Sequence, residues 1–236
     1  MAHRQVDAAA TPAPDMTDGD QLLLFDMDGV ILEGHGTDPA VHDDALDEAI
    51  AEAGLSVDDD TRSLLAGYEY DTEFVRGCEH LGIDPVAFYR RRERHSASHT
   101  IDRLAAGDRT LYPDSDALDG FADDYTLGLI SNNYDAVVEF VVDHYDLDGF
   151  AYARGREPGV GGFYRRKPNP HYLLAGREAL GGTDGVYVGD RPTDVMAARR
   201  AGLDAIFIRR PHNGDVSLPV EPRAMIDSLT ALSEYL

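Results

Sequence analysis

The stretch Leu22-Leu23-Leu24-Phe25-Asp26-Met27-Asp28-Gly29-Val30 is an apolar run that ends in two aspartates one residue apart. The glycine that follows them permits a sharp turn of the chain. In an open α/β sheet, ligands bind outside the carboxyl ends of the strands. The pattern therefore points two carboxylates at a candidate site, where burial of unpaired charge would cost several kcal/mol, roughly. The same pattern also ends ordinary strand–helix units.

Composition bounds the fold and the partners. The chain has 236 residues, enough for one α/β domain with an insertion or for two small domains, and its net charge is −23 from 21 basic and 44 acidic residues. Such a charge repels nucleic acid and anionic lipid, so we expect neither as a partner. A hydrophobic fraction of 43% is that of a folded protein, which makes the acidity a property of the surface.

The basic residues are arginines with one exception, Lys167. Together with the acidic balance, this favours a protein adapted to high salt, and a GC-rich genome is the alternative explanation. The single cysteine, Cys78, excludes an internal disulfide and is expected to be a small buried residue. No apolar run has membrane-spanning length and the N-terminus lacks a signal core, so we expect a cytoplasmic protein, either a monomer or a homodimer.

The order of apolar and helical patterns predicts an α/β fold. We expect a doubly wound, mostly parallel, Rossmann-like sheet with an inserted helical region. The expected strands cover residues 21–26, 126–131, 150–153, 186–190 and 204–208. The expected helices include residues 61–66, 71–81, 85–97, 116–121, 134–145, 170–180, 192–201 and 225–235, with a loop or hairpin at 155–166. We expect residues 1–20 to be a mobile tail, 21–35 and 112–236 the core, and 36–111 a separate helical domain.

Polar residues cluster at four places near strand ends or in adjacent loops. These residues are Asp26, Asp28, Ser131, Asn132, Lys167, Asp190 and Asp194. Their order resembles the haloacid dehalogenase superfamily, a group of mostly phosphate-ester hydrolases. The matching motifs are Asp-x-Asp-Gly-Val at 26–30, a strand ending in Ser131, Lys167-Pro168, and Gly-Asp-x-x-x-Asp at 189–194. Each motif alone is weak, and four in order are strong.

The resemblance implies a role for each residue. Asp26 would be the nucleophile, since a carboxylate needs no deprotonation, and Asp28 the general acid and base. Ser131, Asn132 and Lys167 would bind the phosphoryl group. Magnesium would be held by Asp26, the backbone carbonyl of Asp28, Asp190 and Asp194. Each residue also has an alternative role. Asp28 could stabilise a turn, Ser131 could cap the end of its strand, and Asp190 could cap a helix. Asp194 could pair with Lys167.

Two basic stretches allow two interpretations each. The run Arg90-Arg91-Arg92-Glu93-Arg94-His95 could grip an anionic substrate or form a solvated face that pairs with nearby acids, and we favour the second interpretation. The same alternatives apply to the arginines near Lys167, which are Arg154, Arg156, Arg165 and Arg166. The histidines His95 and His99 have metal-ligand spacing but lack a third ligand, so we do not expect a metal there.

The resemblance implies magnesium-dependent hydrolysis of a small phosphorylated metabolite through a phospho-Asp26 intermediate. The helical region is similar to the caps of phosphoglycolate-phosphatase-like and phosphoglucomutase-like members, so phosphoglycolate or a sugar phosphate is the expected substrate class. True dehalogenases of the superfamily lack the second aspartate, so Asp28 favours phosphoryl chemistry. A phosphomutase is the alternative, and a non-catalytic binding or regulatory protein on the same scaffold is a further one.

Overall fold

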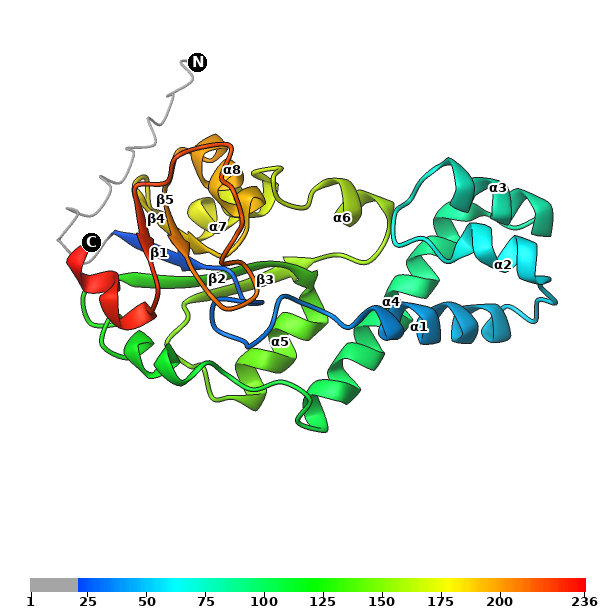
Figure 1. Ribbon diagram of the computed structural model, residues 1–236, viewed down its shortest axis with the longest axis horizontal. Helices are drawn as coiled ribbons and strands as arrows, with labels where there is room; N and C mark the ends of the chain where they lie inside the picture. The colour runs from blue at the N-terminus through cyan, green and yellow to red at the C-terminus, as the bar shows by residue number, and fades with distance from the viewer. Residues whose placement is uncertain (1–20) are drawn as a thin grey trace, which may run out of the picture.

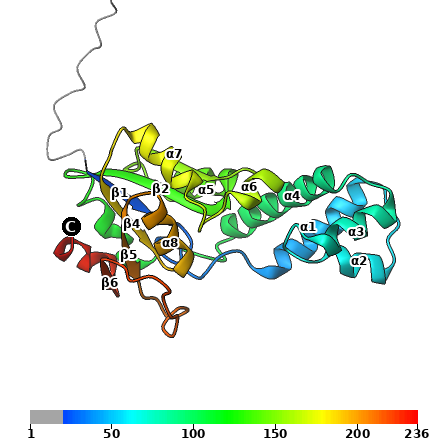
Figure 2. The same ribbon diagram turned by 90° about the horizontal axis from the view of Figure 1, so that it is seen from above.

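The computed structural model describes residues 21–236, and the expected tail, residues 1–20, lies outside the described residues. The elements run β1 (Leu22–Phe25), α1 (Pro39–Glu52), α2 (Asp59–Leu65), α3 (Thr72–Leu81), α4 (Pro85–Ala105), η2 (Pro113–Leu118), β2 (Thr126–Tyr134), α5 (Asp135–His144), β3 (Tyr152–Arg156), α6 (Val160–Tyr164), α7 (His171–Leu180), β4 (Gly185–Gly189), α8 (Pro192–Arg200), β5 (Asp204–Ile208), β6 (Ala224–Ile226) and η3 (Leu229–Glu234). Helices α1–α4 extend away from the sheet in two perpendicular views (Figures 1 and 2). The expected α/β class is confirmed.

The sheet has six strands in the order β3-β2-β1-β4-β5-β6, and every neighbouring pair is parallel. The chain winds outward from β1 through β2 to β3, then returns to β4 on the other side of β1. This reversal places the carboxyl ends of β1, β2 and β4 next to one another. Open α/β sheets bind ligands at such a point.

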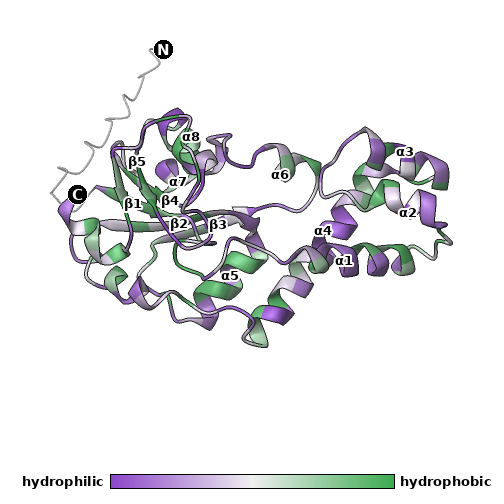
Figure 3. Cartoon of the chain, in the orientation of Figure 1, coloured by the Kyte–Doolittle hydropathy of each residue, from purple (hydrophilic) through white to green (hydrophobic). Residues whose placement is uncertain are grey.

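The central strand is apolar on both faces because helices cover both. Leu22 and Leu24 pack in one cluster with residues of α7 and α8. Leu23 and Phe25 pack in another, with the valines of α5 and the leucines of η3. Successive side chains of a strand point to opposite faces, so a strand buried on both sides reads as a continuous apolar run. Figure 3 shows this hydrophobic interior in the sheet and along α5.

The helical region between β1 and β2 has its own apolar core. Leu46, Leu65, Phe74 and Tyr89 are among its fully buried members. Each of its helices begins after an aspartate whose carboxylate accepts a backbone N–H of the first turn, and these are Asp38, Asp58, Asp71 and Asp84. Aspartate is a favoured N-cap, so part of the acidity of the chain starts helices.

Three expectations about local structure were wrong. Residues 155–166, expected as a loop, include the short helix α6. Helix α4 runs to Ala105 and not to residue 97, because Thr100 and Leu104 continue its buried face. The expected C-terminal helix is replaced by strand β6, which adds to the edge of the sheet, and by the 3₁₀ helix η3. Leu229 and Leu232 are both buried, and their spacing of three suits a 3₁₀ turn.

Within residues 21–236, no helix combines the length and the apolar character needed to cross a bilayer.

Candidate active site

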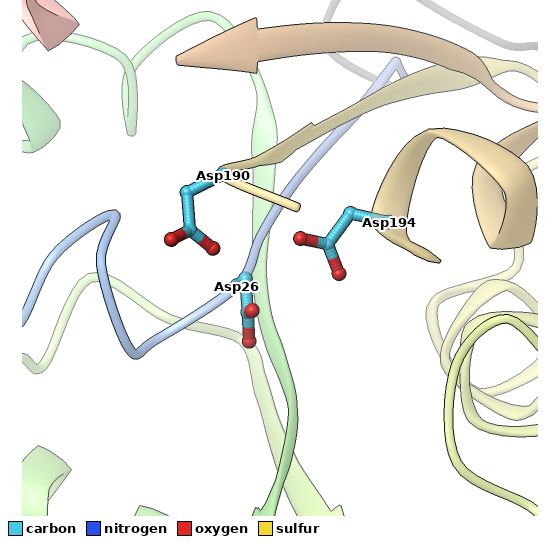
Figure 4. Close-up of side chains that lie close together, drawn as sticks. All are labelled: Asp26, Asp190 and Asp194. Carbon is cyan, nitrogen blue, oxygen red and sulfur yellow. The ribbon is translucent and has the colours of Figure 1, made fainter. Parts of the chain in front are cut away.

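Four predicted residues converge at the carboxyl edge of the sheet. Asp26 follows β1, Asp190 follows β4, Asp194 lies in the first turn of α8, and Lys167 precedes α7. All four are buried. Figure 4 shows the three side chains lying close together and extending from separate elements. Residues far apart in the sequence thus form one cluster, which we call the carboxylate cluster.

Lys167 lies at the centre of this cluster. Its Nζ lies 3.0 Å from Asp26 Oδ1 and 2.8 Å from Asp194 Oδ1. It also lies 2.6 Å from the hydroxyl oxygen of Tyr187, which in turn donates to the carbonyl of Ile130 at 2.7 Å. Burial by itself lowers the pKa of Lys167, but Asp194 and Asp26 overcome that effect and hold it above its ordinary value. The ammonium is therefore charged and fully paired.

The three carboxylates carry more negative charge than Lys167 can balance. Burial raises the pKa of Asp26 to about 6, although Lys167 opposes the shift. Burial, together with repulsion from Asp194 and Asp26, raises the pKa of Asp190 to about 8. With all three groups ionised, Lys167 balances one charge, and the half-exposed Arg191, 3.8 Å from Asp190 Oδ1, offsets part of the remaining two. Such a cluster favours protons or a divalent cation.

The donor set fits a hard divalent cation. One oxygen each from Asp26, Asp190 and Asp194 lie within 4.8 Å of one another, the only such group found in residues 21–236. Asp190 Oδ1 is buried and has no hydrogen-bond partner among the described residues. The other oxygen, Oδ2, lies 2.6 Å from Nε2 of His212. Oδ1 forms only a long ion pair with Arg191, whose Nε lies 3.8 Å away. An oxygen-only donor set suits magnesium.

Asp28 lies beside this cluster on the turn after β1. Its Oδ2 accepts a hydrogen bond from Asn133 Nδ2 at 2.9 Å, and its Oδ1 lies 2.7 Å from Nη1 of Arg109. The turn depends on Gly29, which has a φ of 80°. A Cβ at Gly29 would lie 2.2 Å from Asp190 Oδ2, so a side chain there would collide with the cluster.

Ser131 and Asn132 lie near the end of β2. Ser131 is buried, and its Oγ accepts the backbone N–H of Asn133 at 3.2 Å. Asn132 exchanges two hydrogen bonds with the backbone of Lys167, accepting at 2.8 Å and donating at 3.2 Å. Asn132 therefore orients the Lys167 segment, and its predicted contact with substrate stays a prediction.

A cavity of about 260 Å³ opens above these residues. Asp26, Asp28 and Ser131 line it from the sheet side. His42 and Tyr68 line it from the helical region. The insertion thus supplies one wall of the cavity that holds the predicted nucleophile.

The arginines near Lys167 divide into two groups. Arg156 and Arg166 line the cavity, and Arg154 and Arg165 are not among its lining residues. Arg156 forms a buried ion pair with Glu93 at 2.6 Å. Arg166 stacks on the ring of Phe163, with its guanidinium carbon 3.7 Å from the ring centroid. Of these four, only Arg166 reaches the cavity without a short ion pair.

The run at residues 90–95 is only partly a solvated face. Arg91 pairs with Glu52 at 3.4 Å, as we favoured. Arg92 and Glu93 are buried, so that interpretation is wrong for both. Arg92 donates to backbone carbonyls such as that of Leu65, at 2.8 Å. The run contributes to packing as well as to the surface.

The histidine pair on α4 contacts acidic residues of α1. Nδ1 of His95 lies 3.2 Å from an oxygen of Glu48, and Nε2 of His99 lies 2.7 Å from the same oxygen. Nε2 of His95 lies 2.7 Å from Glu52. These partly exposed contacts are ionic only where the histidines are protonated.

Several polar side chains at the site were not identified from the sequence. Among them are Arg109, Asn133, Tyr187, Arg191 and His212. Tyr187 carries a hydroxyl in an otherwise apolar strand, and Asn133 directly follows the predicted pair, so both had a local signal. Arg109 and His212 reach the site from loops, and nothing adjacent in the sequence marks them.

Known proteins resemble this chain over most of its length. Residues 21–202 match the family of haloacid dehalogenase-like hydrolases. The chain belongs to that family. A phosphoglycolate phosphatase of Rhodospirillum rubrum is 26% identical over 229 residues, which cover 92% of this chain and 90% of that protein. Family membership confirms the expected hydrolase, and this relative supports a phosphatase.

Solved structures confirm the fold. CbbY from Rhodobacter sphaeroides, in complex with phosphate, superposes with a TM-score of 0.63 at 19% identity, covering 90% of this chain and 96% of that one. A candidate β-phosphoglucomutase from Thermotoga maritima superposes with a TM-score of 0.54 at 19% identity, covering 92% and 100%. At these identities the likeness concerns the fold alone.

Proposed function

We propose that this hydrolase cleaves a small phosphomonoester through a phosphorylated Asp26, with magnesium as cofactor. The observation that carries the proposal is the buried Asp26 carboxylate, held 3.0 Å from the ammonium of Lys167 beside Asp190 and Asp194. A buried carboxylate with a paired cation and an unbalanced acidic neighbourhood suits attack on an anionic phosphoryl group.

The reaction has two steps. In the first, an oxygen of Asp26 forms a bond to phosphorus while the ester P–O bond breaks, and Asp28 gives a proton to the departing alcohol oxygen. In the second, water attacks the phosphorus of phospho-Asp26, Asp28 takes a proton from that water, and phosphate leaves. Lys167 offsets negative charge on the phosphoryl oxygens, and the Ser131 hydroxyl donates to one of them.

Magnesium would be held by the carboxylates of Asp26 and Asp190 and the backbone carbonyl of Asp28. Asp194 pairs with Lys167 and would reach the cation through a bound water. When bound, the cation neutralises phosphoryl charge that three carboxylates would otherwise repel. The free Oδ1 of Asp190 supports this ligand set.

Residues 36–111 would act as a cap over the cavity, with residues 21–35 and 112–236 as the catalytic core. The support is the apolar cluster of α1–α4, to which Phe163 of α6 also contributes, and the position of His42 and Tyr68 in the cavity wall. Closure of such a domain excludes bulk water and adds contacts to the substrate.

The proposed substrate is phosphoglycolate or a sugar phosphate, by analogy with the phosphoglycolate phosphatase relative. The test is phosphate release from a panel of phosphomonoesters, with and without magnesium, in molar salt to match the expected halophilic surface. Magnesium-dependent release supports the proposal. Absence of turnover across the panel would favour a non-catalytic protein. Isomerisation of a hexose 1-phosphate without release of phosphate, given a trace of the bisphosphate, would favour a mutase.

A further inference from the structure

The two linkers that join the helical region to the sheet are paired with each other. Leu32 and Leu111 form an antiparallel bridge, and the N–H of Glu33 donates to the carbonyl of Thr110 at 2.9 Å. Arg109 directly precedes this short ladder. Its backbone carbonyl accepts the hydroxyl of Tyr145, the residue at the end of α5, at 2.7 Å. Arg109 is therefore fixed to the sheet side of the linkers.

The side chain of Arg109 uses its whole guanidinium. Nε donates to the carbonyl of Glu33 at 2.5 Å, and one terminal nitrogen lies 3.4 Å from the carbonyl of Gly34. The other terminal nitrogen, Nη1, lies 2.7 Å from Oδ1 of Asp28, and the two side chains are 16% and 10% exposed. The carbonyls fix the plane of the guanidinium, and that plane fixes the position of Oδ1.

Asp28 is thus held from two sides. Asn133 donates to Oδ2 at 2.9 Å while Arg109 contacts Oδ1. One oxygen accepts a hydrogen bond and the other forms a close, mostly buried ion pair, which restricts a side chain that would otherwise sample several rotamers. Arginine suits this task because its planar fork is rigid and always charged.

We infer that Arg109 is a positioning residue for Asp28, holding the carboxylate where it can exchange a proton with the ester oxygen. The inference rests on the proposed function, in which Asp28 is the acid and base. Gly36 and Gly107, both with positive φ, lie on the cap side of the ladder. The contact between Arg109 and Asp28 therefore lies on the sheet side of both glycines.

The inference is tested by comparing two esters. An alkyl phosphate needs a proton on its leaving group, whereas p-nitrophenyl phosphate has a weakly basic leaving group that needs none. For Arg109→Gln, we expect kcat/KM to fall roughly 10–100-fold with the alkyl ester and less than about threefold with the aryl ester. Asp28→Asn should show the same bias, and the double variant should be no slower than Asp28→Asn alone.

Controls separate positioning from folding. Arg103→Gln, near the end of α4 and paired with the exposed Asp38, should leave both esters unchanged. The ratio of the two rates in one sample does not depend on the folded fraction, so partial unfolding of Arg109→Gln cannot imitate the effect. An equal fall with both esters, or additive effects in the double variant, overturns the inference. If the native protein cleaves neither ester, the proposed function fails and the inference falls with it.

Discussion

Two buried groups of charged side chains differ in how their charges balance. Where β3 meets α4, Arg156 and Glu93 are 1% and 2% exposed and form two contacts, at 2.6 and 3.0 Å. Their charges are equal and opposite. The carboxylate cluster around Lys167 combines three acids with one ammonium. The first group balances its own charge, whereas the second keeps an excess of negative charge that the proposed cation would offset.

The difference indicates that the Arg156–Glu93 pair stabilises the packing, whereas the carboxylate cluster is suited to bind a ligand. Glu93 also accepts the backbone N–H of Gly159, so its lone pairs are used within the protein. Asp190 keeps a buried oxygen free of any hydrogen bond among the described residues. A satisfied pair contributes to one fixed packing arrangement, whereas a buried oxygen without a hydrogen bond beside other carboxylates is a candidate ligand for a cation.

The largest effect is expected from the carboxylate cluster. Asp26→Asn keeps the shape of the side chain but removes the nucleophile, so magnesium-dependent phosphate release should fall by roughly 10⁴-fold or more. The fold should persist, because one of three repelling charges is removed. Asp59→Asn, on the exposed start of α2, is the matched control. Turnover within tenfold of the native rate would exclude Asp26 as nucleophile.

The next largest effect is expected in the stability of the protein when the ion pair of Arg156 and Glu93, the balanced pair, is broken. Glu93→Gln leaves the guanidinium of Arg156 buried without a counter-charge, which should lower the free energy of unfolding by about 3–5 kcal/mol. Urea denaturation measures this change. Glu79→Gln, exposed on α3, should change it by less than about 0.5 kcal/mol. A Glu93 variant as stable as the control would show that the pair is dispensable.

The sequence predicted the carboxylate cluster but could not predict the balanced pair, for a physical reason. Asp26 and Asp190 each follow an apolar run, so the strand that positions the side chain is visible beside it. Arg156 and Glu93 are separated by 63 residues, and no local pattern joins them. Arg109 could not be predicted for the same reason, because its partner Asp28 is far away in the sequence and the two meet only where the linkers pair.

At the C-terminus the sequence predicted a helix at residues 225–235, but the structure has strand β6 and the 3₁₀ helix η3 there. Tertiary contacts account for the difference. Asp114 accepts hydrogen bonds from the hydroxyl of Ser228 and the N–H of Leu229, both at 2.9 Å, and so fixes the start of η3. A contact with a residue more than a hundred positions away is absent from any local pattern.

A third effect is expected in the pH dependence of stability without metal. The pKa of Asp190 is raised from 3.8 to about 8 by burial and by its acidic neighbours, so the folded state binds a proton more tightly than the unfolded state. Its contribution to the free energy of unfolding is therefore present at low pH and is lost as pH rises from about 4 to about 8. Thermal melting in chelator should show this decline.

Two comparisons sharpen that measurement. Asp190→Asn should decline less over the same pH range, because the titrating group is absent. Excess magnesium should raise the melting temperature most at pH 8, where the native cluster is ionised, and should have little effect on the variant. Equal pH profiles for the native protein and the variant would show that Asp190 does not carry the excess charge.

The smallest effect is expected at the ion pairs of His95, His99 and Glu48 between α1 and α4. These side chains are 20–50% exposed, so solvent screens their attraction. His99→Ala should lower the free energy of unfolding by about 0.2–1 kcal/mol. Because we interpret the contacts as ion pairs and not as a metal site, added zinc should not raise the melting temperature of the native protein more than that of His99→Ala. A zinc-dependent increase confined to the native protein would instead identify a metal site between the two helices. The carboxylate cluster would then no longer be the one proposed cation site among the described residues.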